Sequence, residues 1–165
     1  MTDEIQQQAQ PVGESKPNTW LDQPQDRFRL LGEVFFLLSA SVEHSRYRLL
    51  DVGRLVIEPI RRQQFKLYHR GDAPVGLVTW AFLGAEAESH FVSGKSLRPD
   101  QLKSGEALWI LDFVAPFGDA KSIAGDLART SFATRRSARA VRRNPDGTVR
   151  KVLRFTQTFH GSVEA

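Results

Sequence analysis

The chain has 165 residues, no cysteine and a formal net charge of +4 at pH 7, with 41% hydrophobic and 25% charged residues. This length suits one domain, the composition is ordinary for a globular protein, and the lack of cysteine excludes disulfides, a thiol nucleophile and a thiolate metal site. No apolar run approaches the roughly 18 residues of a membrane span, and the polar, acidic first residues are unlike a signal peptide, so we expect a cytoplasmic protein.

Charge is distributed unevenly along the chain. Residues 1–25 are rich in Gln, Pro, Ser, Asn and Asp and poor in large apolar side chains, which predicts a disordered N-terminal tail. Residues 129–154 carry nine Arg or Lys side chains and a single Asp, which favours an anionic partner. Charge alone does not separate an acidic protein from nucleic acid, and a solvated basic face is the plainer interpretation.

Helices are predicted to come first in the folded part of the chain. Asp26 is placed to cap a helix, and apolar residues recur at helical spacing from Phe28 to Leu38. A second, shorter helix is expected over 47–55 and should end near Pro59, because proline interrupts the helical hydrogen-bond pattern.

Strand patterns follow, interleaved with helical ones. We predict two strands joined by a Gly/Pro turn, a short helix, a polar stretch, a strongly apolar strand, a helix and a final hairpin. In chain order these elements cover 64–69, 75–83, 86–92, 108–114, 121–132, 138–143 and 148–156. This order predicts an α+β domain whose central, mostly antiparallel sheet is flanked by helices.

Asp112 is the most unusual residue of the pattern, because it lies among six apolar residues of the strand over 108–114. A buried carboxylate is costly unless a partner satisfies it or a reaction uses it. Strand alternation would place Asp112 on one face with Ile110 and Val114, near the carboxyl end of a central strand. A structural role, such as bonding a backbone amide or a buried arginine, remains an equal alternative at this point.

Few other side chains indicate chemistry. Of the four histidines, His44 stands out because it follows the apolar helix in a Ser-rich loop at the edge of the expected core. The chain has no G-x-S-x-G elbow, no G-x-G or Walker loop for phosphates, and no His/carboxylate cluster with metal spacing. We therefore expect no metal and no resident cofactor.

Taken together, the segments resemble the RTX-toxin-activating lysine acyltransferases, the hemolysin-activating family. The resemblance spans about residues 30–158, and residues 105–119, which include Asp112, form its most specific part. Its other matching segments are 31–34, 38–44, 59–68 and 73–81. The resemblance implies an acyltransferase domain over 26–160, similar to the Gcn5-type acetyltransferase fold without its coenzyme A pyrophosphate loop.

The resemblance also implies an activity and a site. A member of this family takes a fatty acyl chain from the phosphopantetheine thioester of acyl carrier protein and places it on internal lysines of an RTX-type protoxin, which activates the toxin. The family's essential histidine and aspartate fall on His44 and Asp112, and a supporting serine falls on Ser41. Because acyl carrier proteins are acidic, we expect the carrier to contact Arg139, Arg142 and Arg143.

Several alternatives stay open on sequence alone. His44 can act as a general base towards the lysine amine or form a covalent acyl-histidine. Asp112 can orient the imidazole or assist deprotonation directly. Members of the family can dimerise, so a homodimer is an expectation. The rival functions are a non-catalytic basic module, for which nucleic acid is the less expected ligand, and an inactive toxin chaperone.

Overall fold

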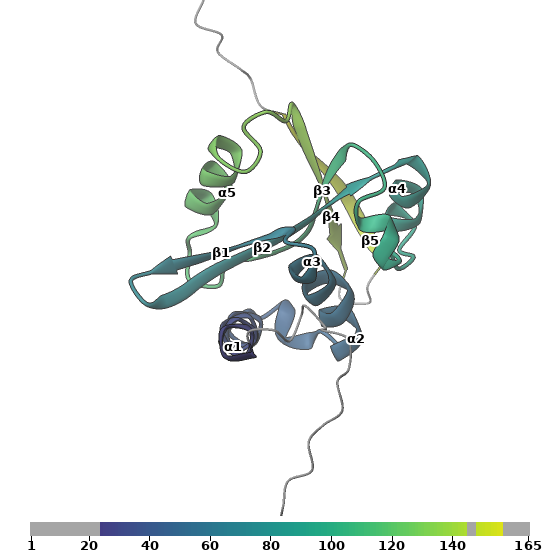
Figure 1. Ribbon diagram of the computed structural model, residues 1–165. Coiled ribbons are helices and arrows are strands. Elements are labelled where there is room, and N and C mark those ends of the chain that lie inside the picture. Colours follow the sequence, from purple (N-terminus) through teal and green to yellow (C-terminus); the bar gives the residue numbers. More distant parts are fainter. Residues whose placement is uncertain (1–23, 145–147, 157–165) are drawn as a thin grey trace, which may run out of the picture.

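The computed structural model describes residues 24–144 and 148–156 (Figure 1). Most of the predicted N-terminal tail, the centre of the last predicted turn at 145–147 and the end of the predicted domain at 157–160 lie outside the described residues. The first helix, α1 (Pro24–Ala40), begins three residues before the position that follows the predicted cap, Asp26. Asp26 therefore lies within its first turn and is not the N-cap, because a proline, which needs no N–H partner there, suits the first helical turn.

The second predicted helix is longer than expected. It consists of α2 (Leu49–Val52), a single π-helical turn (Gly53–Ile57) and α3 (Glu58–Arg61), so the predicted end near Pro59 was wrong. Pro59 lies in the first turn of α3 and cannot donate to the carbonyl of Leu55. That carbonyl instead accepts a hydrogen bond of 2.8 Å from Thr79 Oγ1 of a neighbouring strand. The helix therefore continues past the proline because the sheet satisfies the group that the proline leaves unbonded.

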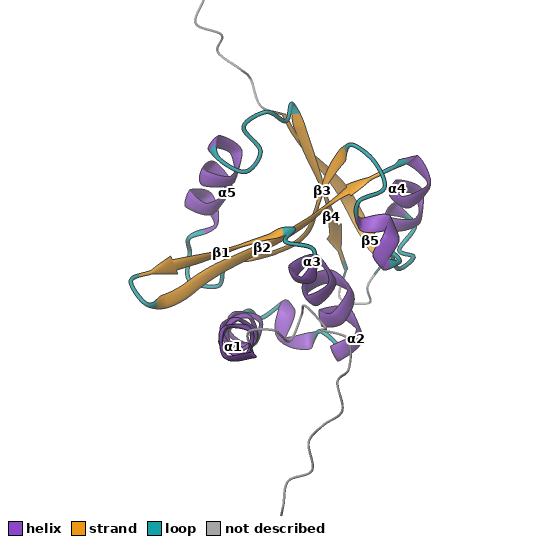
Figure 2. Cartoon of the chain, in the orientation of Figure 1, coloured by secondary structure: helices purple, strands orange, loops and turns teal. Residues whose placement is uncertain are grey.

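The strands form one five-stranded sheet in the order β1-β2-β3-β4-β5 (Figure 2). All neighbouring strands are antiparallel except β3 and β4, which are parallel. Both predicted hairpins and the apolar central strand are confirmed. The strands are β1 (Phe65–Arg70), β2 (Ala73–Leu83), β3 (Ala107–Val114), β4 (Ser137–Arg143) and β5 (Val149–Thr156).

Helices cover both faces of this sheet. Figure 1 shows α1, α2 and α3 beneath the sheet and α5 (Ala120–Arg129) on the opposite face, while α4 (Ala85–Val92) lies beside the far end of β2 and β3. Helix α5 ends three residues before the predicted end at 132. The observed architecture confirms the predicted α+β class and is consistent with an acetyltransferase-like fold. No helix in the described part of the chain combines the length and apolar character that a membrane crossing requires.

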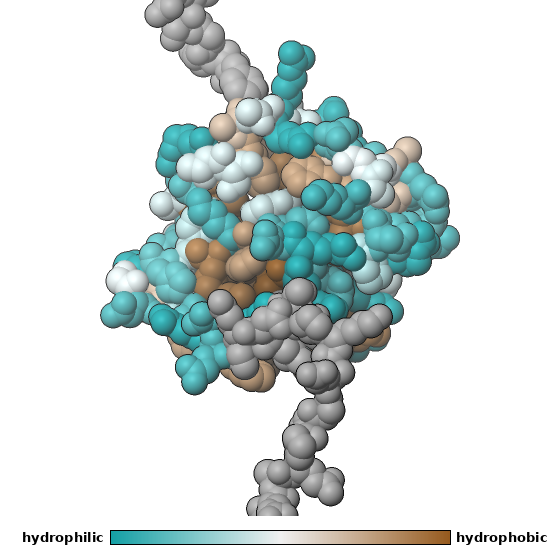
Figure 3. Space-filling model, viewed as in Figure 1, coloured by the Kyte–Doolittle hydropathy of each residue, from teal (hydrophilic) through white to brown (hydrophobic). Residues whose placement is uncertain are grey.

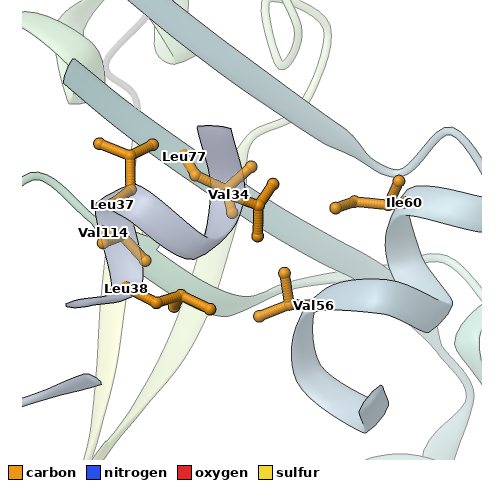
Figure 4. Packing of buried hydrophobic residues seen from close by; sticks show 7 residues of the cluster. All are labelled: Val34, Leu37, Leu38, Val56, Ile60, Leu77 and Val114. Atoms are coloured by element: carbon orange, nitrogen blue, oxygen red, sulfur yellow. The ribbon is translucent and has the colours of Figure 1, made fainter. Parts of the chain in front are cut away.

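Three apolar clusters hold these layers together. The first, shown in Figure 4, packs α1 and the α2–α3 stretch on β2 and β3, and consists of Val34, Leu37, Leu38, Val56, Ile60, Leu77 and Val114. The second joins α4 to the same face through Phe91 and Trp109, whose rings meet edge to face. The third joins α5 to the other face through Ile123 and Leu127. Each face of the sheet is therefore fixed to its own helices.

Candidate active site

The loop that follows α1 positions His44. The apolar face of α1 is anchored by buried Leu37 and Leu38, and after Ala40 the chain turns into a short 3-10 helix, His44–Arg46. The amide of Ser45 donates to the carbonyl of Ser41 at 2.8 Å, which closes the turn. His44 is thereby buried, with 8% of its surface exposed, at the edge of the first apolar cluster.

Asp112 reaches the same face because β3 carries a β-bulge. Thr79 of β2 pairs with Asp112, but the next residue, Trp80, pairs with Ile110, so Leu111 has no partner on β2. A bulge of this kind places two successive side chains on one side of a sheet. Leu111 packs with α4, and Asp112 points to the same helix-bearing face.

The bulge corrects the predicted alternation. Asp112 shares its face with Val114, as expected, but Ile110 packs on the opposite face with α5. The central position of the strand was predicted correctly: β3 is the third of five strands and Asp112 is near its carboxyl end.

His44 and Asp112 form a buried hydrogen-bonded pair. His44 Nε2 lies 2.8 Å from Asp112 Oδ1, although the two residues are 68 positions apart in the chain. An ionised carboxylate only accepts hydrogen bonds, so Nε2 must carry the proton. The lone pair of the neutral imidazole is then on Nδ1, which lies 2.6 Å from Ser41 Oγ and accepts its hydrogen bond. The structure therefore brings together all three predicted residues of the site.

The surroundings tune the basicity of His44. Burial lowers its pKa, but the hydrogen bond and the negative charge of Asp112, with a smaller effect of Glu43, outweigh burial, so the pKa lies above the ordinary 6.5. A histidine with a raised pKa is a stronger base once it is deprotonated. The arrangement can therefore accept a proton from an amine once the imidazole is neutral.

The two oxygens of Asp112 differ sharply in their partners. Oδ1 accepts from His44 Nε2, from the amide of Phe113 at 3.0 Å and from the hydroxyl of Tyr47 at 3.4 Å. Oδ2 is buried and has no hydrogen-bond partner among the described residues. A buried carboxylate oxygen is normally satisfied, so Oδ2 keeps acceptor capacity that no described residue uses.

A cleft of about 2060 Å³ gives access to this pair. It opens where β3 and β4 separate, since within the described residues these strands pair only at Trp109 with Arg139 and at Ile110 with Ala140. Helix α5 lines one wall with small and apolar side chains, among them Ala124. Figure 3 shows brown, apolar surface beside α5, bordered by hydrophilic side chains. The cleft can thus hold an apolar chain next to the His44–Asp112 pair.

The three arginines expected to contact a carrier lie in different surroundings. Arg142 is exposed and lines the cleft. Arg139 is only partly exposed: it forms an ion pair with Glu88 and lies over the ring of Trp109, 5.7 Å from its centroid. The side chain of Arg143 lies outside the described part of the chain.

Two residues that the sequence analysis did not single out belong to the site. Tyr47 contacts both His44 and Asp112, and Arg150 lines the cleft on β5. Tyr47 was taken as the start of a helix, and the available signal was its position three residues after His44. Among the described residues, no three His, Asp or Glu side chains gather closely enough to hold a metal ion.

Comparison with known proteins gives one family match and two long matches to relatives. Residues 23–156 match the model of the RTX toxin acyltransferase family. An uncharacterized protein of Synechocystis sp. is 30% identical over 138 residues, which are 82% of this chain and 92% of that protein. The RTX-I toxin-activating lysine-acyltransferase ApxIC of Actinobacillus pleuropneumoniae is 33% identical over 129 residues, 78% of this chain and 74% of the relative.

Shorter matches connect the chain to enzymes named for their acyl group. The protein-lysine myristoyltransferase RtxC of Kingella kingae is 34% identical over 95 residues, which are 57% of each chain. The chain thus spans little more than half the length of this relative. The family match covers the whole of the described fold, including His44 and Asp112. This chain therefore belongs to the RTX toxin acyltransferase family, and relatives that match it are lysine acyltransferases that activate RTX toxins.

Proposed function

We propose that this protein transfers a fatty acyl chain from acyl carrier protein to internal lysine side chains of an RTX-type protoxin. The observation that carries the proposal is the buried pair of His44 and Asp112, 2.8 Å apart, at the point where the cleft passes between β3 and β4. The pair supplies a base, the cleft supplies an apolar surface, and two of the matched relatives are named as enzymes that acylate lysine.

The proposed chemistry is aminolysis of a thioester. The lysine nitrogen attacks the thioester carbonyl carbon, a C–N bond forms, the C–S bond breaks, and the carrier thiolate leaves. His44 Nδ1 accepts the proton that the attacking nitrogen loses, directly or through the hydroxyl of Ser41, and this proton is available to the departing thiolate. Asp112 holds Nε2–H and stabilises the imidazolium that forms, as a triad carboxylate does.

Direct transfer fits the geometry better than an acyl-histidine intermediate. Nε2 is held by Asp112 and Nδ1 by Ser41, so both ring nitrogens already have partners. A covalent route would require Nδ1 to leave Ser41 and to attack the thioester itself. Incubation with acyl carrier protein that carries a labelled acyl chain, in the absence of acceptor, distinguishes the routes. Direct transfer leaves the protein unlabelled, whereas the covalent route transfers the labelled acyl chain to His44.

Acyl carrier protein fits the donor side because basic side chains outnumber acidic ones in the lining of the cleft. Arg142 and Arg150 are among them, and an acidic carrier would be drawn to such a surface. Charge reversal at Arg142 and Arg143 should weaken carrier binding, whereas charge reversal at Arg136, which is exposed and is not among the residues that line the cleft, should have less effect. Unchanged affinity in the Arg142/Arg143 variant would refute this docking surface.

The activity itself is tested by intact-mass analysis of a candidate RTX protoxin after incubation with the protein and acyl carrier proteins of several chain lengths. We expect the mass of one or two acyl groups to be added, located on lysine by peptide mapping, and stable to hydroxylamine as amides are. Simple binding of protoxin without any mass gain would instead indicate the chaperone function.

A further inference from the structure

Tyr47 is placed against both members of the reacting pair. It directly follows the 3-10 helix that carries His44, and its amide donates to the His44 carbonyl at 2.9 Å. Its ring meets the imidazole edge to face, with centroids 5.1 Å apart, and its hydroxyl lies 3.4 Å from Asp112 Oδ1. The last distance is long for a hydrogen bond between oxygens, as is common before a substrate is bound.

The hydrogen bonds on Asp112 are concentrated on one of its two oxygens. Three donors, from His44, Tyr47 and Phe113, are directed at Oδ1, and none of the described residues donates to Oδ2. A carboxylate has about four acceptor positions shared between its oxygens. Donors from three residues on Oδ1 oppose rotation of the carboxylate, so Oδ1 stays aligned with His44 Nε2.

We infer that Tyr47 is a positioning residue, which holds Asp112 through Oδ1 so that the carboxylate keeps the His44 imidazole in the orientation that directs Nδ1 towards the acceptor lysine amine. The identity of that amine rests on the proposed function, but the contact between Tyr47 and the His44–Asp112 pair does not. Tyr47 does not react; it fixes the carboxylate that holds the base.

The hydroxyl of Tyr47 should also be detectable in the titration of His44. The charged groups that act on His44 are Asp112 of β3 and the adjacent Glu43, and Tyr47 is the neutral donor beside them. By donating to Asp112, the hydroxyl takes up part of the negative charge that would otherwise stabilise the imidazolium. Removing it should therefore raise the pKa of His44 further.

The chain offers a matched control because it contains only two tyrosines. Tyr68 also donates to a carboxylate, Asp126 Oδ2 at 2.9 Å, but it does so on the opposite face of the sheet, beside α5. Tyr47→Phe and Tyr68→Phe each remove one hydroxyl from one carboxylate and keep the ring. Only the first change involves the His44–Asp112 pair.

The first experiment is an NMR titration of the four histidines, with His44 assigned by its loss in His44→Ala. We expect Tyr47→Phe to raise the pKa of His44 by about half a unit and Tyr68→Phe to leave it unchanged. An unchanged pKa in a folded Tyr47→Phe protein overturns the inference. If that variant does not fold, 3-fluorotyrosine is incorporated in the Tyr68→Phe background, where Tyr47 is the remaining tyrosine. The fluorine resonance of Tyr47 should then shift as His44 titrates. A resonance that does not change during that titration overturns the inference.

The second experiment separates positioning from packing. When the concentrations of acceptor and acyl carrier protein are both varied, Tyr47→Phe should lower kcat by roughly tenfold without changing KM for the carrier. The acid limb of its pH–rate profile should move to higher pH together with the pKa of His44. A loss confined to stability, with kcat and the pH profile unchanged, contradicts a positioning role. Wild-type protein that acylates nothing would contradict the proposed function and leave the NMR result as an independent test of the contact.

Discussion

Gly76 fixes the distance between β2 and α5, and replacing it with alanine should disturb both stability and the cleft. A Cβ at this position would lie 2.2 Å from Ile123 Cδ1 and 3.2 Å from the carbonyl oxygen of Val114. Carbon atoms normally approach to about 3.5–4.0 Å, so one partner would have to move by roughly 1.5 Å. Ile123 is 2% exposed and cannot rotate into solvent. Overpacking of this kind costs about 1–3 kcal/mol, and the shift of α5 should also lower kcat/KM because α5 forms a wall of the cleft.

The assay is urea unfolding of a double-mutant cycle. Ile123→Val removes the clashing Cδ1 and alone should cost about 0.5–1.5 kcal/mol. The double variant Gly76→Ala/Ile123→Val should then be more stable than the sum of the two single effects, by about 1 kcal/mol or more. Gly32→Ala is the control, because nothing lies within 4 Å of its Cβ position in α1; it should stabilise the protein by up to about 1 kcal/mol. A fully stable Gly76→Ala protein, or an additive cycle, would refute the packing of α5 described above.

Two further predictions concern the elements that support the site. Thr79→Val leaves the Leu55 carbonyl without its donor and should lower the free energy of unfolding by about 1–3 kcal/mol. Thr79→Ser retains the hydroxyl and should lose less stability. Equal losses of the two variants in urea unfolding would rule out the hydrogen bond as the cause. The pKa of His44 is raised by folding, so its contribution to stability is fully present below its ordinary pKa of 6.5 and is lost as pH rises through the higher folded value. The difference in unfolding free energy between wild type and His44→Gln should therefore shrink as pH rises through this window, and a constant or growing difference would contradict the direction of the shift.

Local sequence patterns sufficed for most elements of the fold. The alternating hairpin of β1 and β2 and the apolar strand β3 have patterns that little else can satisfy, and they were predicted within one or two residues. The helix that contains Pro59 was predicted too short, because its continuation depends on a hydroxyl from Thr79, which no pattern near the proline reveals. The prediction from local patterns therefore failed where a contact between residues far apart in the chain determines the structure.

Only part of the site could be predicted, again because contacts between distant residues determine the rest. Asp112 was conspicuous as a charge within an apolar strand, but its direction depends on a bulge at Leu111 that only the register with β2 defines. His44 gave a weak signal by itself, and its pairing with Asp112 was expected from the family resemblance and not from spacing. Tyr47 gave only a weak signal, its position three residues after His44, because a half-buried aromatic residue beside a helix is ordinary.

Single-turnover acylation of an RTX protoxin shows whether His44 and Asp112 act together in the reaction. The rate is compared among wild type, His44→Ala, Asp112→Asn and the double variant. If the buried pair acts as one unit, each single variant should lose nearly as much rate as the double variant, by at least about a hundredfold. His69→Ala, which alters an exposed histidine paired with Glu33, should retain wild-type rate. If the rate losses of the two single variants multiply in the double variant, or if His44→Ala acylates the protoxin substantially, His44 and Asp112 do not react as one unit.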